Sequence, residues 1–129
     1  MTKKSQTILI VEDEKPLIRA LCDKFRHEGF NVLEARNGAE GLEVALREHP
    51  DLILLDIIMP VMDGVSMFKK LREDEWGKSV PVIMLTNLIY NEKIAEAIMQ
   101  GSHEYLVKSD FKLEDVVAKV RERLAMPHN

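Results

Sequence analysis

The sequence predicts an α/β fold, in which helices cover both faces of a doubly wound parallel sheet of five strands. Two observations predict it. Short apolar runs alternate with segments whose apolar residues recur at helical spacing, and this alternation repeats five times along 129 residues. Such alternation is typical of parallel strands that are joined by helices. Three of the apolar runs are also continuous, as expected for strands that are covered on both sides.

Five strands and five helices are predicted from these patterns. In chain order they are strand 7–11, helix 15–29, strand 31–35, helix 39–48, strand 52–55, helix 65–72, strand 81–85, helix 92–100, strand 104–107 and helix 113–124. A chain of this length suits one domain. We place that domain at residues 7–124, after a disordered N-terminal segment, 1–6, and before a C-terminal tail, 125–129.

The first half of the chain contains two of the continuous runs, TILIV and LILL. Between them, NVLEA alternates only weakly, which suits an edge strand. Gly29 is a candidate for the C-cap of the first helix. The apolar residues that fall on one face of each helix are Leu17, Ile18, Leu21 and Phe25 in the first and Leu42, Ala45 and Leu46 in the second.

The second half contains the third continuous run, PVIML, and the short run EYLV. Gly101 is predicted to end the fourth helix. The apolar residues of the third and fourth helices are Met67, Phe68 and Leu71, and Ile94, Ala95, Ile98 and Met99. Right-handed crossovers leave few doubly wound topologies, and we expect the strand order 2-1-3-4-5.

Composition and charge argue against several classes of protein. The net charge is −4 and no basic block is present, so direct binding to nucleic acid is not expected. The first apolar run is too short for a signal peptide or a membrane span, so no membrane contact and a cytoplasmic location are expected. Cys22 lies beside Leu21 in a helical pattern and is predicted to be a buried thiol. Trp76 is predicted to pack over a helix end, with a contact to a partner as the alternative.

Polar and charged residues follow the strands of the predicted sheet. In an open parallel sheet, ligands bind beyond the carboxyl ends of the strands, so these residues should share one edge. They are Glu12 and Asp13 after the first strand, Asp56 after the third, Thr86 after the fourth and Lys108 after the fifth.

This set of side chains suits phosphoryl transfer. Packed carboxylates repel one another, and oxygen ligands are those that Mg²⁺ prefers. A lysine provides a positive charge for an anion, and a carboxylate can act as the oxygen nucleophile, for which Asp56 is the best candidate. Alternatively, taken alone, Asp56 could begin a turn, and Glu12 and Asp13 could cap the helix near Lys15.

Four stretches, ILIVEDE, DLILLDIIMPVMDG, VIMLTN and EYLVK, resemble the receiver domain of two-component response regulators over nearly the whole chain. The resemblance implies the flavodoxin-like fold. It also implies that Asp13 and Asp56 ligate Mg²⁺ directly, that Glu12 acts through water, and that the carbonyl of Ile58 is a further ligand.

The resemblance further implies a signalling switch. Asp56 would accept phosphate from a sensor histidine kinase or a histidine phosphotransfer protein, and Lys108 would pair with the phosphoryl group. Thr86 would move to hydrogen-bond it and Tyr105 would move inward, altering the face built by the fourth helix, fifth strand and fifth helix for a downstream protein target. Such a protein is no conventional enzyme, since it catalyses only its own phosphorylation and dephosphorylation, and it is a monomer or a phosphorylation-dependent dimer.

Two positions depart from the family pattern. Ser109 stands where receivers usually have a proline joined by a cis bond, so the isomer of the Lys108–Ser109 bond is left open. Asn87 stands where a small residue is usual. These departures leave a phosphorylation-independent binding module as the alternative. An enzyme on the same fold is disfavoured, because no phosphate-cradling loop follows the first strand and Ile58 replaces the second aspartate of a phosphatase motif. A stand-alone receiver is expected, with a piece of a longer regulator as the alternative.

Overall fold

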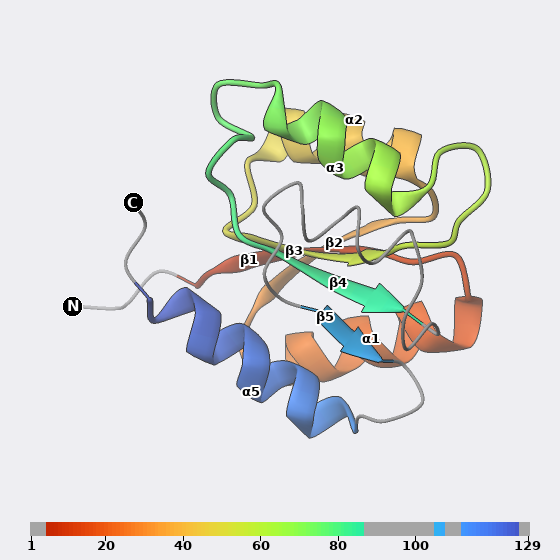
Figure 1. Cartoon of the computed structure of the whole chain (residues 1–129). Helices are drawn as coiled ribbons and strands as arrows, with labels where there is room; N and C mark the ends of the chain where they lie inside the picture. The colour runs from red at the N-terminus through yellow and green to blue at the C-terminus, as the bar shows by residue number, and fades with distance from the viewer. Residues whose placement is uncertain (1–4, 87–104, 108–111, 127–129) are drawn as a thin grey trace.

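The computed structural model describes residues 5–86, 105–107 and 112–126 (Figure 1). Within these residues, strands alternate with helices as predicted. The elements are β1 (Thr7–Val11), α1 (Lys15–His27), β2 (Asn31–Ala35), α2 (Gly38–Glu48), β3 (Leu52–Asp56), α3 (Gly64–Arg72), β4 (Val82–Thr86), β5 (Tyr105–Val107) and α5 (Leu113–Leu124).

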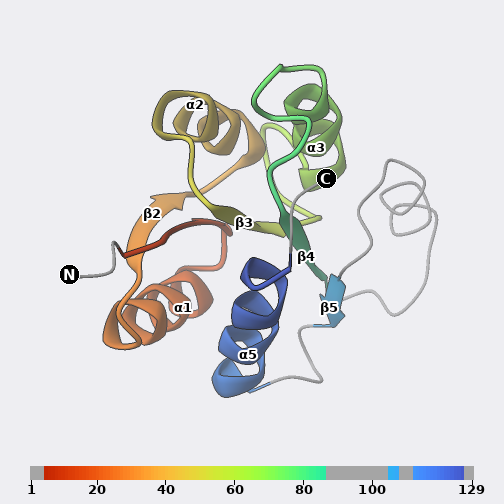
Figure 2. The same ribbon diagram turned by 90° about the vertical axis from the view of Figure 1, so that its left-hand side faces the viewer.

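The strands form one parallel sheet in the order β2-β1-β3-β4-β5. Helices α2 and α3 cover one face, and α1 and α5 cover the other (Figure 2). The predicted α/β fold with a parallel sheet is therefore confirmed. The predicted helix 92–100 lies outside the described residues, as do Lys108 and Ser109 and therefore the bond between them.

Each central strand contributes to two apolar layers. Leu9 and Ile53 pack in the layer beneath α2 and α3, whereas Ile8 and Leu52 pack in the layer beneath α1 and α5. All four side chains are fully buried. Because successive side chains of a strand point to opposite faces, a strand covered on both sides must be apolar at every position. This explains why β1, β3 and β4 appear in the sequence as unbroken apolar runs.

Most predicted boundaries coincide with the observed ones, and the others differ by one or two residues. β3 continues to Asp56, because that residue pairs with Leu85 of β4. β4 begins after Pro81, which has no N–H to donate. Helices α2 and α3 each begin at a glycine, one residue earlier than predicted. Their N-caps supply the reason, since Asn37 accepts the N–H of Glu40 and Asp63 accepts that of Ser66, both at 2.8 Å.

Helix α1 ends two residues earlier than predicted. Its last residue is His27 and its C-cap is Glu28, while Gly29 follows with φ of 95°. A glycine adopts this backbone conformation at little cost, so Gly29 allows the chain to turn into β2.

Trp76 packs over a helix end, as predicted. Its indole stacks on the imidazole of His49, the C-cap of α2, with ring centroids 4.3 Å apart and planes 7° from parallel. In the part of the chain that the structure describes, no helix has the length and apolar character needed to cross a membrane.

The thiol of Cys22 is buried, as predicted, at 1% exposure. Burial, with a smaller contribution from Glu34, raises its pKa from 9.0 to about 12. The protonated thiol therefore favours the folded state below pH 9, and this contribution is lost as the pH rises toward 12.

Because the thiolate is the reactive form, Cys22 should resist alkylation. At pH 8 we expect iodoacetamide to modify the folded protein at least about 1000-fold more slowly than the urea-unfolded protein, since the pKa shift and burial act together. Intact mass against time measures both rates. Rapid modification of the folded protein would show an accessible thiol.

Candidate functional site

Three carboxylates converge at the carboxyl edge of the sheet. One carboxylate oxygen from each of Glu12, Asp13 and Asp56 lies within 4.8 Å of the other two. Glu12 is fully buried and Asp56 is 3% exposed, whereas Asp13 is half-buried. The sequence predicted that these three side chains would share one edge, and the structure brings them together.

The strand register explains this convergence. β1 and β3 are neighbours, and Val11 at the end of β1 pairs with Leu55. The next residue of each strand is therefore an acidic one, Glu12 on one side and Asp56 on the other. The backbone N–H of Glu12 donates to the carbonyl of Ala35 at 3.0 Å, which fixes the turn after β1 against β2.

Glu12 also supports the start of α1. Its Oε2 accepts the backbone N–H of Glu14 at 3.0 Å, and Glu14 is the N-cap residue, with no capping hydrogen bond from its own side chain. The capping role considered for Glu12 and its place in the acidic cluster are thus compatible.

The acidic cluster fits a small divalent cation. Oxygens of a Mg²⁺ shell lie about 2.1 Å from the ion, so two ligands on opposite sides are about 4.2 Å apart. The observed spacing of up to 4.8 Å needs only a small contraction to reach that value. Three carboxylates this close, two of them buried, repel one another, and a bound cation offsets that repulsion.

The loop between β3 and α3 is held from two sides. The N–H of Gly64 donates to the carbonyl of Ile57 at 2.8 Å, and the N–H of Gly38 donates to the carbonyl of Met62 at 2.8 Å. Ile58 lies in this loop with its side chain 53% exposed. A Cβ on Gly38 would overlap the carbonyl oxygen of Met62. This requirement for glycine was not anticipated from the sequence, because it depends on a loop far along the chain.

The other predicted site residues are only partly placed. Thr86 is the last residue of β4 and follows Leu85, which pairs with Asp56. The backbone of Thr86 therefore lies at the same edge of the sheet as Asp56. Tyr105 begins β5 and pairs with Met84. Lys108 lies outside the described residues.

Val61 adopts a conformation that the sequence did not predict. Its φ is 69°, and the N–H of Met62 donates to the carbonyl of Pro60 at 2.7 Å across it, which closes a γ-turn. A γ-turn with positive φ is rare and strained, and a β-branched residue suits it poorly. The side chain is 83% exposed, so packing does not compensate for the strain. Strained backbone therefore lies five residues after Asp56, in the loop that borders the acidic cluster.

Replacing Val61 with glycine should stabilise the protein. The free energy of unfolding should rise by about 1 kcal/mol, because relief of positive-φ strain exceeds the entropy that glycine adds to the unfolded chain. Urea unfolding of the wild type, Val61→Gly and Val61→Ala measures this. Alanine keeps the positive φ with a smaller side chain and should give a smaller gain. If the alanine variant were the more stable of the two, backbone strain at Val61 would be disproved.

Comparison with protein families gives one clear match. The model of the response regulator receiver domain family matches residues 8–121. Among relatives, histidine kinase P4 of Formosa agariphila is 40% identical over 109 residues, which are 82% of this chain and 8% of that protein. The probable transcriptional regulatory protein TcrX of Mycobacterium tuberculosis is 33% identical, over 92% of this chain and 49% of that protein.

A further relative and two solved structures extend the comparison. The DNA-binding response regulator MtrA of Mycolicibacterium smegmatis is 34% identical, over 96% of this chain and 53% of that protein. The chain thus spans about half the length of these regulators. A CheY-like receiver domain protein from Methanospirillum hungatei has a TM-score of 0.86 at 26% identity and 94% coverage of both chains.

The second structure is the receiver domain of a sensor histidine kinase from Pseudomonas aeruginosa. It matches with a TM-score of 0.87 at 28% identity, over 95% of this chain and 100% of that chain, and holds a magnesium ion in its active site cleft.

Proposed function

The chain belongs to the response regulator receiver domain family, and from this premise we propose that it is a phosphorylation-dependent switch whose phosphoryl acceptor is Asp56. Receiver domains are signalling switches of two-component systems rather than conventional enzymes. The observation that supports the proposal best is the convergence of Glu12, Asp13 and Asp56 at one edge of the sheet.

In the proposed reaction, a carboxylate oxygen of Asp56 attacks the phosphorus of a phosphohistidine. The new P–O bond forms as the P–N bond breaks, and the leaving imidazole nitrogen keeps the electron pair. Asp56 is well placed for this role because β3 holds its backbone and its side chain is nearly buried, with 3% exposure. The fixed position lowers the entropy cost of reaching an in-line approach.

Glu12, Asp13 and Asp56 would hold Mg²⁺, with the carbonyl of Ile58 as a further ligand. When bound, the ion would neutralise charge on the phosphoryl oxygens and bind them directly. Asp13 and Asp56 are the two side chains proposed to bind the ion directly, and Asp13 is the more exposed of the two. This exposure suits a site that must admit a phosphoryl donor. The magnesium in the Pseudomonas receiver domain is consistent with this assignment.

The switch itself would involve residues beyond the acidic cluster. We propose that Lys108 pairs with the phosphoryl group, that Thr86 hydrogen-bonds it, and that Tyr105 responds by moving inward. The register of β4 and β5 supports this set, because Thr86 ends β4 and Tyr105 lies in the neighbouring strand. A phosphoryl group adds about −1.5 to −2 charges and three hydrogen-bond acceptors. This change is large enough to shift the conformation of the segment that contains Thr86.

We further propose that the receiver domain spans residues 7–124 with the complete doubly wound, flavodoxin-like fold, in which a helix over 92–100 covers part of the sheet. The face of that helix, β5 and α5 would then bind a downstream protein.

A histidine kinase or histidine phosphotransfer protein would be the phosphoryl donor, which agrees with the kinase and regulators among the relatives. The expected lack of direct nucleic-acid binding stays a prediction, and among those relatives TcrX is a probable transcriptional regulatory protein and MtrA a DNA-binding response regulator by name.

A phosphorylation-independent binding module is the second candidate. Ser109 and Asn87 favour it, because both depart from the family pattern directly after Lys108 and Thr86 in the sequence. The intact acidic cluster favours the switch instead, since a module with no phosphate to accept gains nothing from three repelling carboxylates.

Treatment with Mg²⁺ and acetyl phosphate, followed by intact mass measurement, separates the two candidates. We expect the mass of one phosphoryl group to be added to the wild type. The addition should be absent in Asp56→Ala and when EDTA replaces Mg²⁺.

Asp23→Asn is the matched control, because Asp23 is an exposed carboxylate of α1 outside the acidic cluster and its replacement should leave the modification unchanged. Phosphorylation of Asp56→Ala would place the acceptor elsewhere. An unmodified wild type would favour the binding module.

A further inference from the structure

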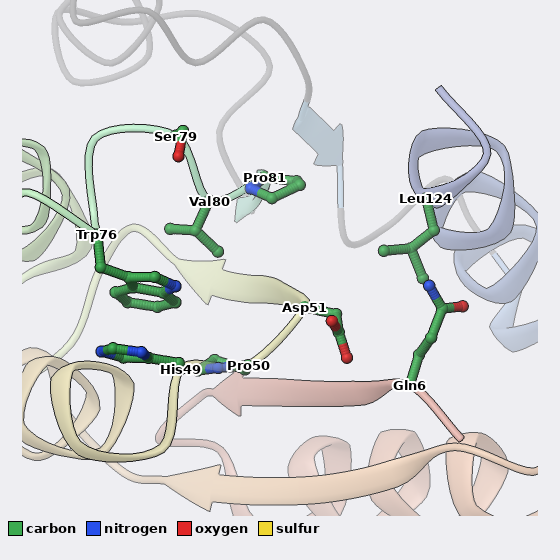
Figure 3. A pocket seen from close by; sticks show the side chains of 9 residues that line it. All are labelled: Gln6, His49, Pro50, Asp51, Trp76, Ser79, Val80, Pro81 and Leu124. Carbon is green, nitrogen blue, oxygen red and sulfur yellow. The ribbon is translucent and has the colours of Figure 1, made fainter. Parts of the chain in front are cut away.

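A polar pocket lies at the amino ends of the strands, at the end of the sheet opposite the acidic cluster. It has a volume of about 190 Å³. His49 and Trp76 form one side, Gln6 and Leu124 form the other, and Asp51 lies between them (Figure 3). Ser79 and Val80 close it beside β4. Among the described residues that line the pocket, Asp51 is the only carboxylate and no lysine or arginine is present.

The carboxylate of Asp51 is held in place by the start of β1. Its Oδ2 accepts the N–H of Thr7 at 2.7 Å, and its own N–H donates to the carbonyl of Thr7 at 2.8 Å. A carboxylate offers about four lone-pair sites, so this bond leaves acceptor capacity for a ligand. The anionic group is therefore fixed in position before any ligand binds.

The aromatic side of the pocket is built at a cost. His49 has φ of 50° and ψ of 61°, in the left-handed region where glycine or asparagine normally follows a helix. Its imidazole nevertheless stacks on Trp76 at 4.3 Å. A residue held in a strained conformation by a fold is a reason to look for a function at that position.

Side-chain hydrogen bonds hold the loop that contributes Trp76 and Ser79 in place. The guanidinium of Arg72 donates through Nη1 to the carbonyls of Gly77 and Val80, at 2.7 and 2.9 Å. Asp74 accepts the N–H of Gly77 at 2.9 Å. The walls of the pocket are thus bound to the body of the domain, as is typical of a preformed ligand site.

We propose that this pocket binds a guanidinium group on an apolar stem, from either a small free molecule or an arginine side chain of another protein. The carboxylate of Asp51 supplies the negative charge, and the side-chain oxygen of Gln6, on the side that faces Asp51 across the pocket, supplies a further acceptor (Figure 3). A guanidinium has five N–H donors in a planar fork and is more weakly hydrated than an ammonium, so it matches several spread acceptors better. Leu124, Pro50 and Val80 provide apolar surface for the stem.

Trp76 gives a direct readout, because it is the single tryptophan of the chain. We would titrate the full chain with agmatine, as the free guanidinium, and with the peptide acetyl-Gly-Arg-Gly-amide, as the side chain. At least one should change the Trp76 emission in a saturable way, with half-saturation on the order of 1 mM or below. Binding of agmatine alone assigns a small molecule, whereas binding of the peptide assigns an arginine side chain.

Variants identify the groups that bind the ligand. Asp51→Asn removes the charge but keeps an oxygen for the N–H of Thr7, and it should weaken binding at least tenfold. Gln6→Leu changes an exposed side chain and should weaken binding about threefold. Glu43→Gln, on the exposed face of α2, is the matched control and should leave binding unchanged.

The uncharged analogue butylurea tests the role of charge and should give no saturable response. The proposal is overturned if neither guanidinium ligand binds. It is equally overturned if butylurea binds as well as agmatine, or if Asp51→Asn and Gln6→Leu both bind like the wild type. Melting curves confirm that each variant is folded.

Discussion

Asp13→Asn is expected to weaken Mg²⁺ binding by at least about tenfold to a hundredfold. Replacing a residue that only hydrogen-bonds a metal ligand already lowers metal affinity by that factor, so the loss of a charged ligand should cost at least as much. Without metal, the same change should stabilise the protein. Asp13 lies within 4.8 Å of two other carboxylates, and removing its charge relieves part of their repulsion. The gain should be about 1 kcal/mol, because Asp13 is half-exposed and solvent screens its charge.

Thermal unfolding with and without Mg²⁺ measures both effects in one experiment. In EDTA the variant should melt above the wild type. In excess Mg²⁺ the wild type should gain stability as the ion binds its folded state, and the variant should gain much less. Asp23→Asn, an exposed carboxylate on α1, is the control and should show the wild-type response to Mg²⁺. Equal Mg²⁺ stabilisation of Asp13→Asn and the wild type would exclude Asp13 as a ligand.

Replacing Gly64 with alanine is expected to lower the free energy of unfolding by about 3 kcal/mol or more. A Cβ at this position would overlap the carbonyl oxygen of Asp56 and lie 2.9 Å from the Cα of Ile57. Both are backbone atoms at the end of β3, so no side chain can rotate away to make room. Either α3 moves outward or the end of β3 is displaced, and urea unfolding measures the cost.

Gly29→Ala is the matched control for this prediction. Gly29 has φ of 95°, but nothing lies within 4 Å of a Cβ built there. Its replacement therefore adds backbone strain alone, which costs about 1–2 kcal/mol. A loss of stability at Gly64 no larger than that at Gly29 would show that the overlap is relieved by a small local shift. Phosphorylation of Gly64→Ala would then also be expected to proceed normally.

The fold could be predicted because its strands are buried on both faces. An unbroken apolar run such as residues 52–55 is distinctive, and the alternation with helices then restricts the topology. Boundaries were less accurate because they depend on capping and strand pairing. The caps Asn37 and Asp63 make their helices begin one residue earlier than predicted. Asp56 belongs to β3 because it pairs with Leu85 of β4.

The acidic cluster could also be predicted, since residues that follow parallel strands must meet at one edge. The loop after β3 could not. The positive φ of Val61 and the contact of Gly38 with Met62 depend on how distant segments meet, and neither valine nor glycine indicates this by its type alone. The pocket around Asp51 was missed for the same reason, because its walls come from four separate segments.

Within the residues that the structure describes, the sheet separates two apolar layers that share no side chain, one beneath α2 and α3 and the other beneath α1 and α5. A change of volume in one layer can therefore be accommodated without repacking the other, and the energetic effects of substitutions in different layers should add. In evolution, the two halves of the interior are then free to drift apart in sequence.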